Sequence, residues 1–184
     1  MIVAGIDLSL VSTGVIVAEV NPDVNADTFR VIAEERIRTT PKKFPHPVER
    51  LWHIASRVLR VLREYGVEDV AIEGYAFSRA NAHAHALGEL GGTVRLLLWR
   101  AGIPFWNAGP TTLKKLVTGK GNAPKDVMLR EVFRRWGYDT DCNDLADAYG
   151  LCRAVAGHHV GHARKSDAEA WSKAERVEAR GEAT

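Results

Sequence analysis

Residues 2–20, which read IVAGIDLSLVSTGVIVAEV, decide the expected fold. Two apolar runs rich in Val and Ile, at 2–8 and 13–20, are separated by the short segment Ser9-Leu10-Val11-Ser12. Continuous runs of small and β-branched residues are typical of buried strands. A third strand is predicted over 28–37. Three successive strands with short connections indicate an antiparallel meander.

Beyond residue 47 the apolar spacing becomes helical. A stripe at intervals of three and four residues, ending at Gly66, predicts an amphipathic helix over 48–62. The elements predicted after it are a strand at 67–76, a helix at 80–101, a strand at 103–108, a short helix from 110, a helix ending at 136 and a helix from 143. This order predicts an α/β fold with a five-stranded mixed sheet, a meander followed by α/β crossovers, flanked by helices.

Length and composition favour one ordinary domain. The chain has 184 residues, of which 46% are hydrophobic and 26% charged, so it can bury a core. No apolar run reaches the roughly 20 residues needed to cross a bilayer, and Asp7 interrupts the N-terminal run, so we expect neither a membrane span nor a signal peptide. Cys142 and Cys152 are too few for a disulfide framework, so we expect a cytoplasmic protein, in the host cell if the source is viral.

The last residues differ from the rest in composition. Basic, acidic and Ala residues alternate after residue 163, where Trp171 and Val177 are the only bulky apolar side chains. We therefore predict a domain over 1–160 and a charged C-terminal tail or solvated helix over 161–184.

Four acids stand where structural needs explain them poorly. Asp7 follows the first apolar run, and Glu73 lies in the run VAIEG. A buried carboxylate is costly unless it is paired or holds a cation. Asp144 and Asp147 are three residues apart and project from one face of the last helix. A structural role, such as capping a backbone amide or pairing with Arg, would explain any one of these acids taken alone. Helix capping explains Asp144 well but Asp147 poorly.

Convergence of these four acids predicts a metal site. Carboxylates that repel one another at short range need divalent cations, and oxygen ligands select Mg²⁺ or Mn²⁺ over zinc. The candidate metal ligands and catalytic residues are Asp7, Glu73, Asp144 and Asp147.

Four motifs in order resemble those of RuvC-type Holliday junction resolvases, in the ribonuclease H-like superfamily. They are GIDxSxxxTG at 5–14, IEGY at 72–75, GxGxAxK at 119–125 and DLADA at 144–148, and the resemblance covers about residues 1–158. It implies a ribonuclease H-like fold and assigns catalysis to the four acids. Asp141 does not match the pattern and is a second choice for a metal ligand.

The resemblance also implies a reaction. The expected activity is a structure-selective DNA endonuclease that resolves four-way junctions with two Mg²⁺ ions per active site, for which Mn²⁺ can substitute. One ion would activate the attacking water and the other would stabilise the leaving 3′-oxygen, so symmetric nicks would leave 5′-phosphate ends.

A basic segment precedes the last acidic motif. Between residues 95 and 135, basic residues greatly outnumber the two acids, Asp126 and Glu131. A solvated helical face is the simpler explanation, but glycines on both sides of Lys120 let a backbone approach phosphates. The resemblance assigns DNA contacts near the scissile phosphate to Lys114 and Lys125, with Lys115 and Lys120 as helpers.

Two aromatic residues and a cation follow the second acid. Tyr75 and Phe77 are predicted to stack on bases opened at a branch point, next to Arg79. Core positions at a strand end explain the two rings equally well. The family usually places one aromatic wedge here, at the position that Ala76 occupies in this chain.

Two symmetric cuts require two active sites, so a homodimer on a four-way junction is expected. The helix at 80–101 is the candidate interface, because Gly88, Gly91 and Gly92 allow close approach of another backbone. Other functions remain open: a ribonuclease H-like nuclease acting on an RNA–DNA hybrid, a flap or an rRNA precursor, or a non-catalytic binder of branched DNA. Half of an actin-like ATPase fits less well, because that fold normally has two such domains.

Overall fold

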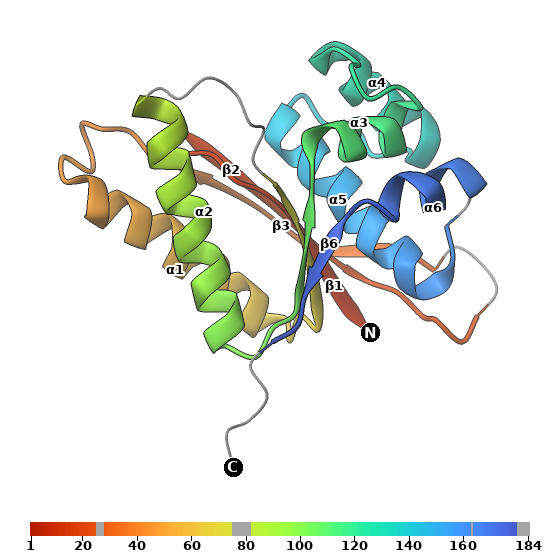
Figure 1. The fold of residues 1–184 in the computed structure, drawn as a ribbon, viewed down its shortest axis with the longest axis horizontal. Coiled ribbons are helices and arrows are strands. Elements are labelled where there is room, and N and C mark those ends of the chain that lie inside the picture. The colour runs from red at the N-terminus through yellow and green to blue at the C-terminus, as the bar shows by residue number, and fades with distance from the viewer. Residues whose placement is uncertain (25–27, 75–81, 163, 180–184) are drawn as a thin grey trace.

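A computed structural model describes residues 1–24, 28–74, 82–162 and 164–179. Its centre is a six-stranded mixed sheet with the order β3-β2-β1-β4-β5-β6 (Figure 1). The strands are β1 (Ile2–Asp7), β2 (Ser12–Glu19), β3 (Arg30–Arg38), β4 (Asp69–Glu73), β5 (Phe105–Ala108) and β6 (Glu175–Val177). The predicted α/β class with a mixed sheet is confirmed.

Strand directions follow the expected topology. β1 pairs antiparallel with β2, and β2 pairs antiparallel with β3, which confirms the meander. β4 lies parallel to β1 on its other side, and β5 lies parallel to β4. The helices that connect these parallel strands supply the crossovers.

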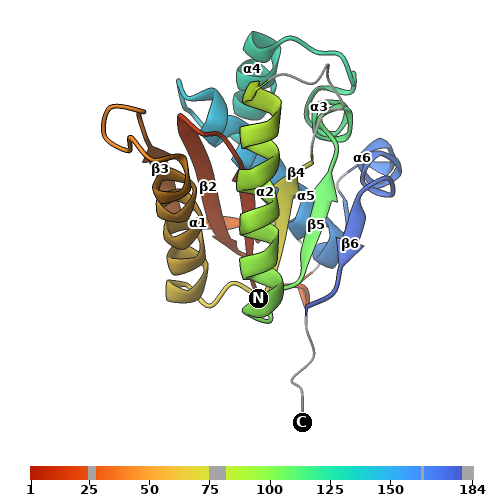
Figure 2. The same cartoon turned by 60° about the vertical axis from the view of Figure 1, so that its left-hand side comes forward.

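Helices cover both faces of the sheet (Figures 1 and 2). α1 and α2 pack together on one face, while α3, α4, α5 and α6 lie on the other. Their bounds are α1 (Pro47–Glu64), α2 (Ala82–Arg100), α3 (Pro110–Thr118), α4 (Lys125–Trp136), α5 (Asn143–Val160) and α6 (Lys165–Trp171). Among the described residues, no helix combines the length and the apolar character that a membrane crossing requires.

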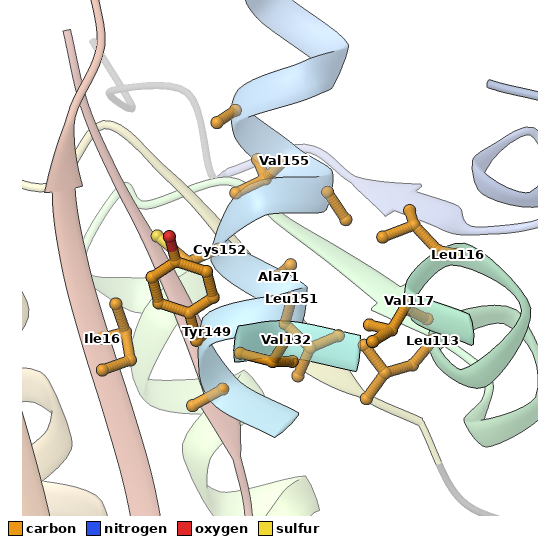
Figure 3. Packing of buried hydrophobic residues seen from close by; sticks show 14 of the residues in the cluster. Ile16, Ala71, Leu113, Leu116, Val117, Val132, Tyr149, Leu151, Cys152 and Val155 are labelled. Carbon is orange, nitrogen blue, oxygen red and sulfur yellow. The ribbon is translucent and has the colours of Figure 1, made fainter. Parts of the chain in front are cut away.

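Alternation along the strands produces two apolar cores. On β1, Ala4 and Ile6 belong to the core under α1 and α2, whereas Val3 belongs to the core around α5. α5 runs through the middle of this second core, where Leu151 and Val155 meet side chains of the sheet and of α3 (Figure 3). Val3, Gly5 and Asp7 therefore share the α5 face of the sheet.

The C-terminal segment differs from the expected charged tail or solvated helix, because part of it is buried. Residues 165–171 form α6, and β6 adds a sixth strand to the sheet by pairing antiparallel with β5, so the expected count of five strands is wrong. On α6 the residues at positions 167, 170 and 171 are buried, and they lie on one helix face at intervals of three and four. That face contains an acid, an Ala and a single Trp, so its apolar content was too low to indicate burial. The expected domain boundary at residue 160 stays a prediction.

Candidate functional site

Neighbouring strands place Asp7 and Glu73 beside each other. Ile6 pairs with Ile72 in the parallel β1–β4 register, and the two acids are the next residues on their strands. The alternation of side chains directs both acids toward α5. Asp7 is 8% exposed, so its carboxyl group is nearly removed from water.

α5 brings the second pair of acids to the same place because two glycines let its backbone touch the sheet. A Cβ on Gly5 would lie 2.0 Å from the carbonyl oxygen of Ala148, and a Cβ on Gly14 would lie 2.3 Å from that of Asp144. Any larger residue would therefore push α5 away from the strands. Gly14 also pairs with Asp7 in the β1–β2 register, so the close approach is at the acids themselves.

Burial raises the pKa values of three of the four acids, and the charges of neighbouring acids raise those of Asp7 and Asp147 further. Burial and then the charges of Glu73 and Asp147 raise the pKa of Asp7 well above its usual value. Burial and the charge of Glu73 raise the pKa of Asp147 to about 7. Burial also raises the pKa of Glu73, but the hydrogen bond that it accepts from Asp7 and the charges of Lys114 and Lys125 oppose this shift.

Asp144 joins this group through its charge, which contributes to the raised pKa values of Asp7 and Asp147. The structure thus gathers the four predicted acids from β1, β4 and α5 into one electrostatically coupled cluster. Asp141, the second choice for a ligand, is exposed in the segment before α5.

The four carboxylates are suitable ligands for a divalent cation, although their side chains are not arranged around a common metal position in this structure. In the part of the chain that the structure describes, no three Asp, Glu, His or Cys side chains stand in a metal-holding arrangement. Asp7 and Glu73 instead share a side-chain hydrogen bond, which raises the pKa of Asp7 and lowers that of Glu73. Buried carboxylate oxygens that repel one another are the ligands that Mg²⁺ and Mn²⁺ favour. Binding would require the side chains to close around the ion.

Arg36 is a neighbour of the cluster that the sequence analysis missed. Its guanidinium lies 3.6 Å from Asp144 Oδ2, and its Nε donates a hydrogen bond to Ser12 Oγ at 2.8 Å. Arg36 pairs with Gly14 in the β2–β3 register, so it lies in the same row across the sheet as Asp7. The sequence shows a basic residue at position 36 in the last strand of the meander. Only the pairing of β3 with β2 reveals that this residue lies near the acids.

The basic segment lies next to the acids through two of its four predicted lysines. Lys114, half-buried on α3, and Lys125, at the start of α4, both lower the pKa values of Glu73 and Asp147. Lys115 and Lys120 are exposed on the same segment. The predicted stacking residues Tyr75 and Phe77, and the neighbouring cation Arg79, lie outside the described residues.

The sequence model of a family described as crossover junction endodeoxyribonuclease RuvC matches residues 3–155. A protein of that name from Thermus thermophilus is 34% identical over 135 residues, which are 72% of this chain and 80% of that protein. The one from Synechococcus sp. (strain CC9311) is 32% identical over 155 residues, 82% of this chain and 95% of that protein.

Solved structures agree with the sequence matches. A Thermus thermophilus RuvC structure superposes with a TM-score of 0.71 at 29% identity, covering 96% of this chain and 100% of that chain. T. thermophilus RuvC in complex with Holliday junction substrate gives a TM-score of 0.73 at 28% identity, covering 96% and 99%. The fowlpox virus resolvase, solved with substrate Holliday junction DNA, shares the fold at 16% identity, with a TM-score of 0.58 and coverage of 86% and 98%.

These likenesses confirm the expected ribonuclease H-like type of fold. The matched residues contain all four acids of the cluster and the lysines beside them. With a family match over most of its length and a shared fold over nearly all of it, the chain belongs to the RuvC family of crossover junction endodeoxyribonucleases.

Proposed function

We propose that this chain resolves four-way DNA junctions by metal-dependent hydrolysis, with Asp7, Glu73, Asp144 and Asp147 holding two Mg²⁺ ions, for which Mn²⁺ can substitute. The observation that carries this proposal is the gathering of these acids, from three separate elements, into one cluster, in which the charges of Glu73 and Asp144 help to raise the pKa values of Asp7 and Asp147. Membership of an endodeoxyribonuclease family supports the same reaction class.

The charges of the groups at the site indicate the role of each in cleavage. Bound cations would supply Lewis-acid activation of the attacking water and stabilise the leaving 3′-oxygen, so that cleavage leaves a 5′-phosphate. The acids orient those cations, and the hydrogen bond between Asp7 and Glu73 must break before both carboxylates can act as ligands. Lys114 and Lys125, whose charges already reach the acids, hold the phosphate that is cut.

The proposed substrate is branched DNA. T. thermophilus RuvC has been solved in complex with Holliday junction substrate, and its fold matches this chain over 96% of the chain's length. The exposed lysines 115 and 120 extend the cationic surface beyond the cluster, where flanking phosphates would bind.

Symmetric cuts require a second copy, and we propose that α2 forms the homodimer interface. Gly88, Gly92, Leu96 and Trp99 follow one another at intervals of four and three residues, so they share one face of α2. Among the described residues, a Cβ on Gly92 would meet nothing within 4 Å, so packing inside the described part of the protomer does not require this glycine. Leu96 is 56% and Trp99 is 38% exposed, which gives this face an apolar contact surface.

The test is a cleavage assay on matched substrates. A labelled four-way junction, a linear duplex of the same arms, a flap and an RNA–DNA hybrid are each incubated with the protein and Mg²⁺, and the new ends are mapped. We expect paired nicks with 5′-phosphates on the junction alone, and loss of cleavage but retained junction binding in Asp7→Asn and Asp147→Asn. Preferred cleavage of the hybrid or flap would overturn the substrate, and binding without cleavage in Mg²⁺ and Mn²⁺ would overturn the activity.

A further inference from the structure

A buried ionic network joins the C-terminal helix to the lysine-bearing segment. Asp167 on α6 is 4% exposed, and its carboxylate binds two arginines. Arg135 of α4 contacts it at 2.7 Å, and Arg164, just before α6, contacts it at 2.6 Å. The side chain of Arg135 is itself only 11% exposed, so this is an interior pair rather than a surface one.

Both arginines also bind the end of α3. Arg135 donates hydrogen bonds to the backbone carbonyls of Leu116 and Val117, and Arg164 donates one to that of Leu116 at 2.9 Å. Carbonyls in the last turn of a helix lack helical partners and attract positive charge. The two guanidinium groups therefore cap α3, and Asp167 holds them in place and neutralises them.

The capped turn lies between the lysines that reach the acids. Lys114 precedes Leu116 on α3, and Lys125 begins α4 after the short connection from Gly119. The opposite, apolar side of α3 packs on α5, where Leu113 and Val117 point toward the helix that carries Asp144 and Asp147 (Figure 3). α6 lies beside α3 in both ribbon views (Figures 1 and 2). α3 is thus held between the acid-bearing helix and α6.

We propose that Asp167 is a positioning residue for DNA cleavage: through Arg135 and Arg164 it fixes the end of α3, and so keeps Lys114 and Lys125 over the acid cluster. The proposal rests on the proposed role of these lysines in holding the cut strand. Asp167 lies outside the matched family region, which ends at residue 155. The expected cause of failure in Asp167→Asn is specific: two adjacent cations, one of them buried, lose their shared anion and release the α3 carbonyls.

The first experiment measures the restraint without DNA. Amide hydrogen exchange is compared for wild type, Asp167→Asn and the milder Arg164→Ala, which alters a more exposed partner. We expect about tenfold faster exchange confined to residues 114–125 in both variants. The control is Asp69→Asn, which removes another buried anchor of the C-terminal segment: Asp69 binds Arg176 of β6 at 3.2 Å and lies at the opposite end of β4 from Glu73. Faster exchange over 114–125 in this control as well would overturn the proposal.

The second experiment measures the consequence for DNA. We expect Asp167→Asn to weaken four-way junction binding about fivefold to twentyfold, to reduce the slope of log Kd against log salt by about 1 to 2, and to raise KM more than it lowers kcat. In a Lys114→Ala/Lys125→Ala background the same substitution should change the affinity less than about twofold, because its effect acts through those lysines. An additive loss in that background, or unchanged binding in Asp167→Asn, would overturn the positioning role. If wild type itself neither binds nor cuts junctions, the proposed function fails, and the exchange data still report whether Asp167 restrains α3.

Discussion

At the scale of single residues, the absence of a side chain on Gly14 decides where the acids lie. The Gly14→Ala substitution would put a methyl group 2.3 Å from the carbonyl oxygen of Asp144, so α5 must shift. We expect a loss of about 1–3 kcal/mol in the free energy of unfolding and a tenfold to hundredfold slower cleavage, since displacing a catalytic group by about 1 Å has effects of that order. Thermal melting and single-turnover cleavage measure the two effects.

A control on the same strand separates displacement from simple instability. Ile16 is fully buried two residues from Gly14 and faces α5 in the same core. Ile16→Ala should destabilise the protein by about 2–4 kcal/mol through a cavity, yet leave Asp144 in place. If both variants lose cleavage in proportion to their stability, Gly14 has no particular role in placing the acids.

The raised pKa of Asp147, about 7, makes the stability of the metal-free protein depend on pH. The folded state keeps the proton while an unfolded Asp releases it near the usual value of 3.8, so folded stability falls as pH rises from about 4 to about 7 and then levels off. The expected fall is on the order of 2–4 kcal/mol. Asp147→Asn should make this profile less steep, because only the contributions of Asp7 and Glu73 remain, and it should melt higher than wild type at pH 8.

Melting curves in EDTA between pH 5 and 8 test this dependence. Added Mg²⁺ should raise the melting temperature of wild type more at pH 8 than at pH 6, because protons compete with the metal for the same oxygens. In Asp147→Asn, added Mg²⁺ should raise the melting temperature less than in wild type at both pH 6 and pH 8. If the stability of the wild type in EDTA rose steadily from pH 5 to pH 8, the raised pKa of Asp147 would be contradicted.

At the scale of elements, sequence patterns sufficed where apolar content was high. The runs at 2–8 and 13–20 predicted β1 and β2, and the DLADA motif placed Asp144 and Asp147 at the start of the last core helix. α6 and β6 could not be found this way, because α6 is buried by packing on α3 and α5, and β6 forms only where β5 offers an edge. Arg36 likewise became part of the site only through the pairing of β3 with β2.

β6 protects the edge of β5, and removing it tests that role. A chain that ends after residue 173 loses the ladder on residues 105–107 of β5 and the contact of Arg176 with buried Asp69. We expect the melting temperature to fall by roughly 5–15 °C and aggregation to rise with concentration, since an exposed strand edge recruits other strands. The Arg176→Ala variant keeps the ladder, so it should lose stability without aggregating. A truncated chain that stays monodisperse and melts like wild type would show that β6 is dispensable.

At the scale of the whole molecule, the exposed face of α2 connects assembly to the outcome of cleavage. A dimer cuts both strands of a cruciform plasmid during one encounter and produces linear DNA, whereas a monomer leaves nicked circles. Leu96→Asp places a charge in the proposed apolar interface, where an unpaired carboxylate is costly. We therefore expect this variant to be monomeric at micromolar concentration by light scattering, and to nick the cruciform without linearising it, while each single nick proceeds at a rate within about threefold of wild type.

The matched control is Val48→Asp, which changes an equally exposed apolar residue at the start of α1 (63% against 56%). Because Val48 lies off the α2 face that contains Gly88 and Gly92, this variant should remain dimeric and should still linearise the plasmid. A dimer that survives Leu96→Asp but dissociates in Val48→Asp would move the interface to α1. A wild-type chain that is monomeric both free and on the junction would remove the dimer altogether, and the two cuts would then have to come from separate encounters.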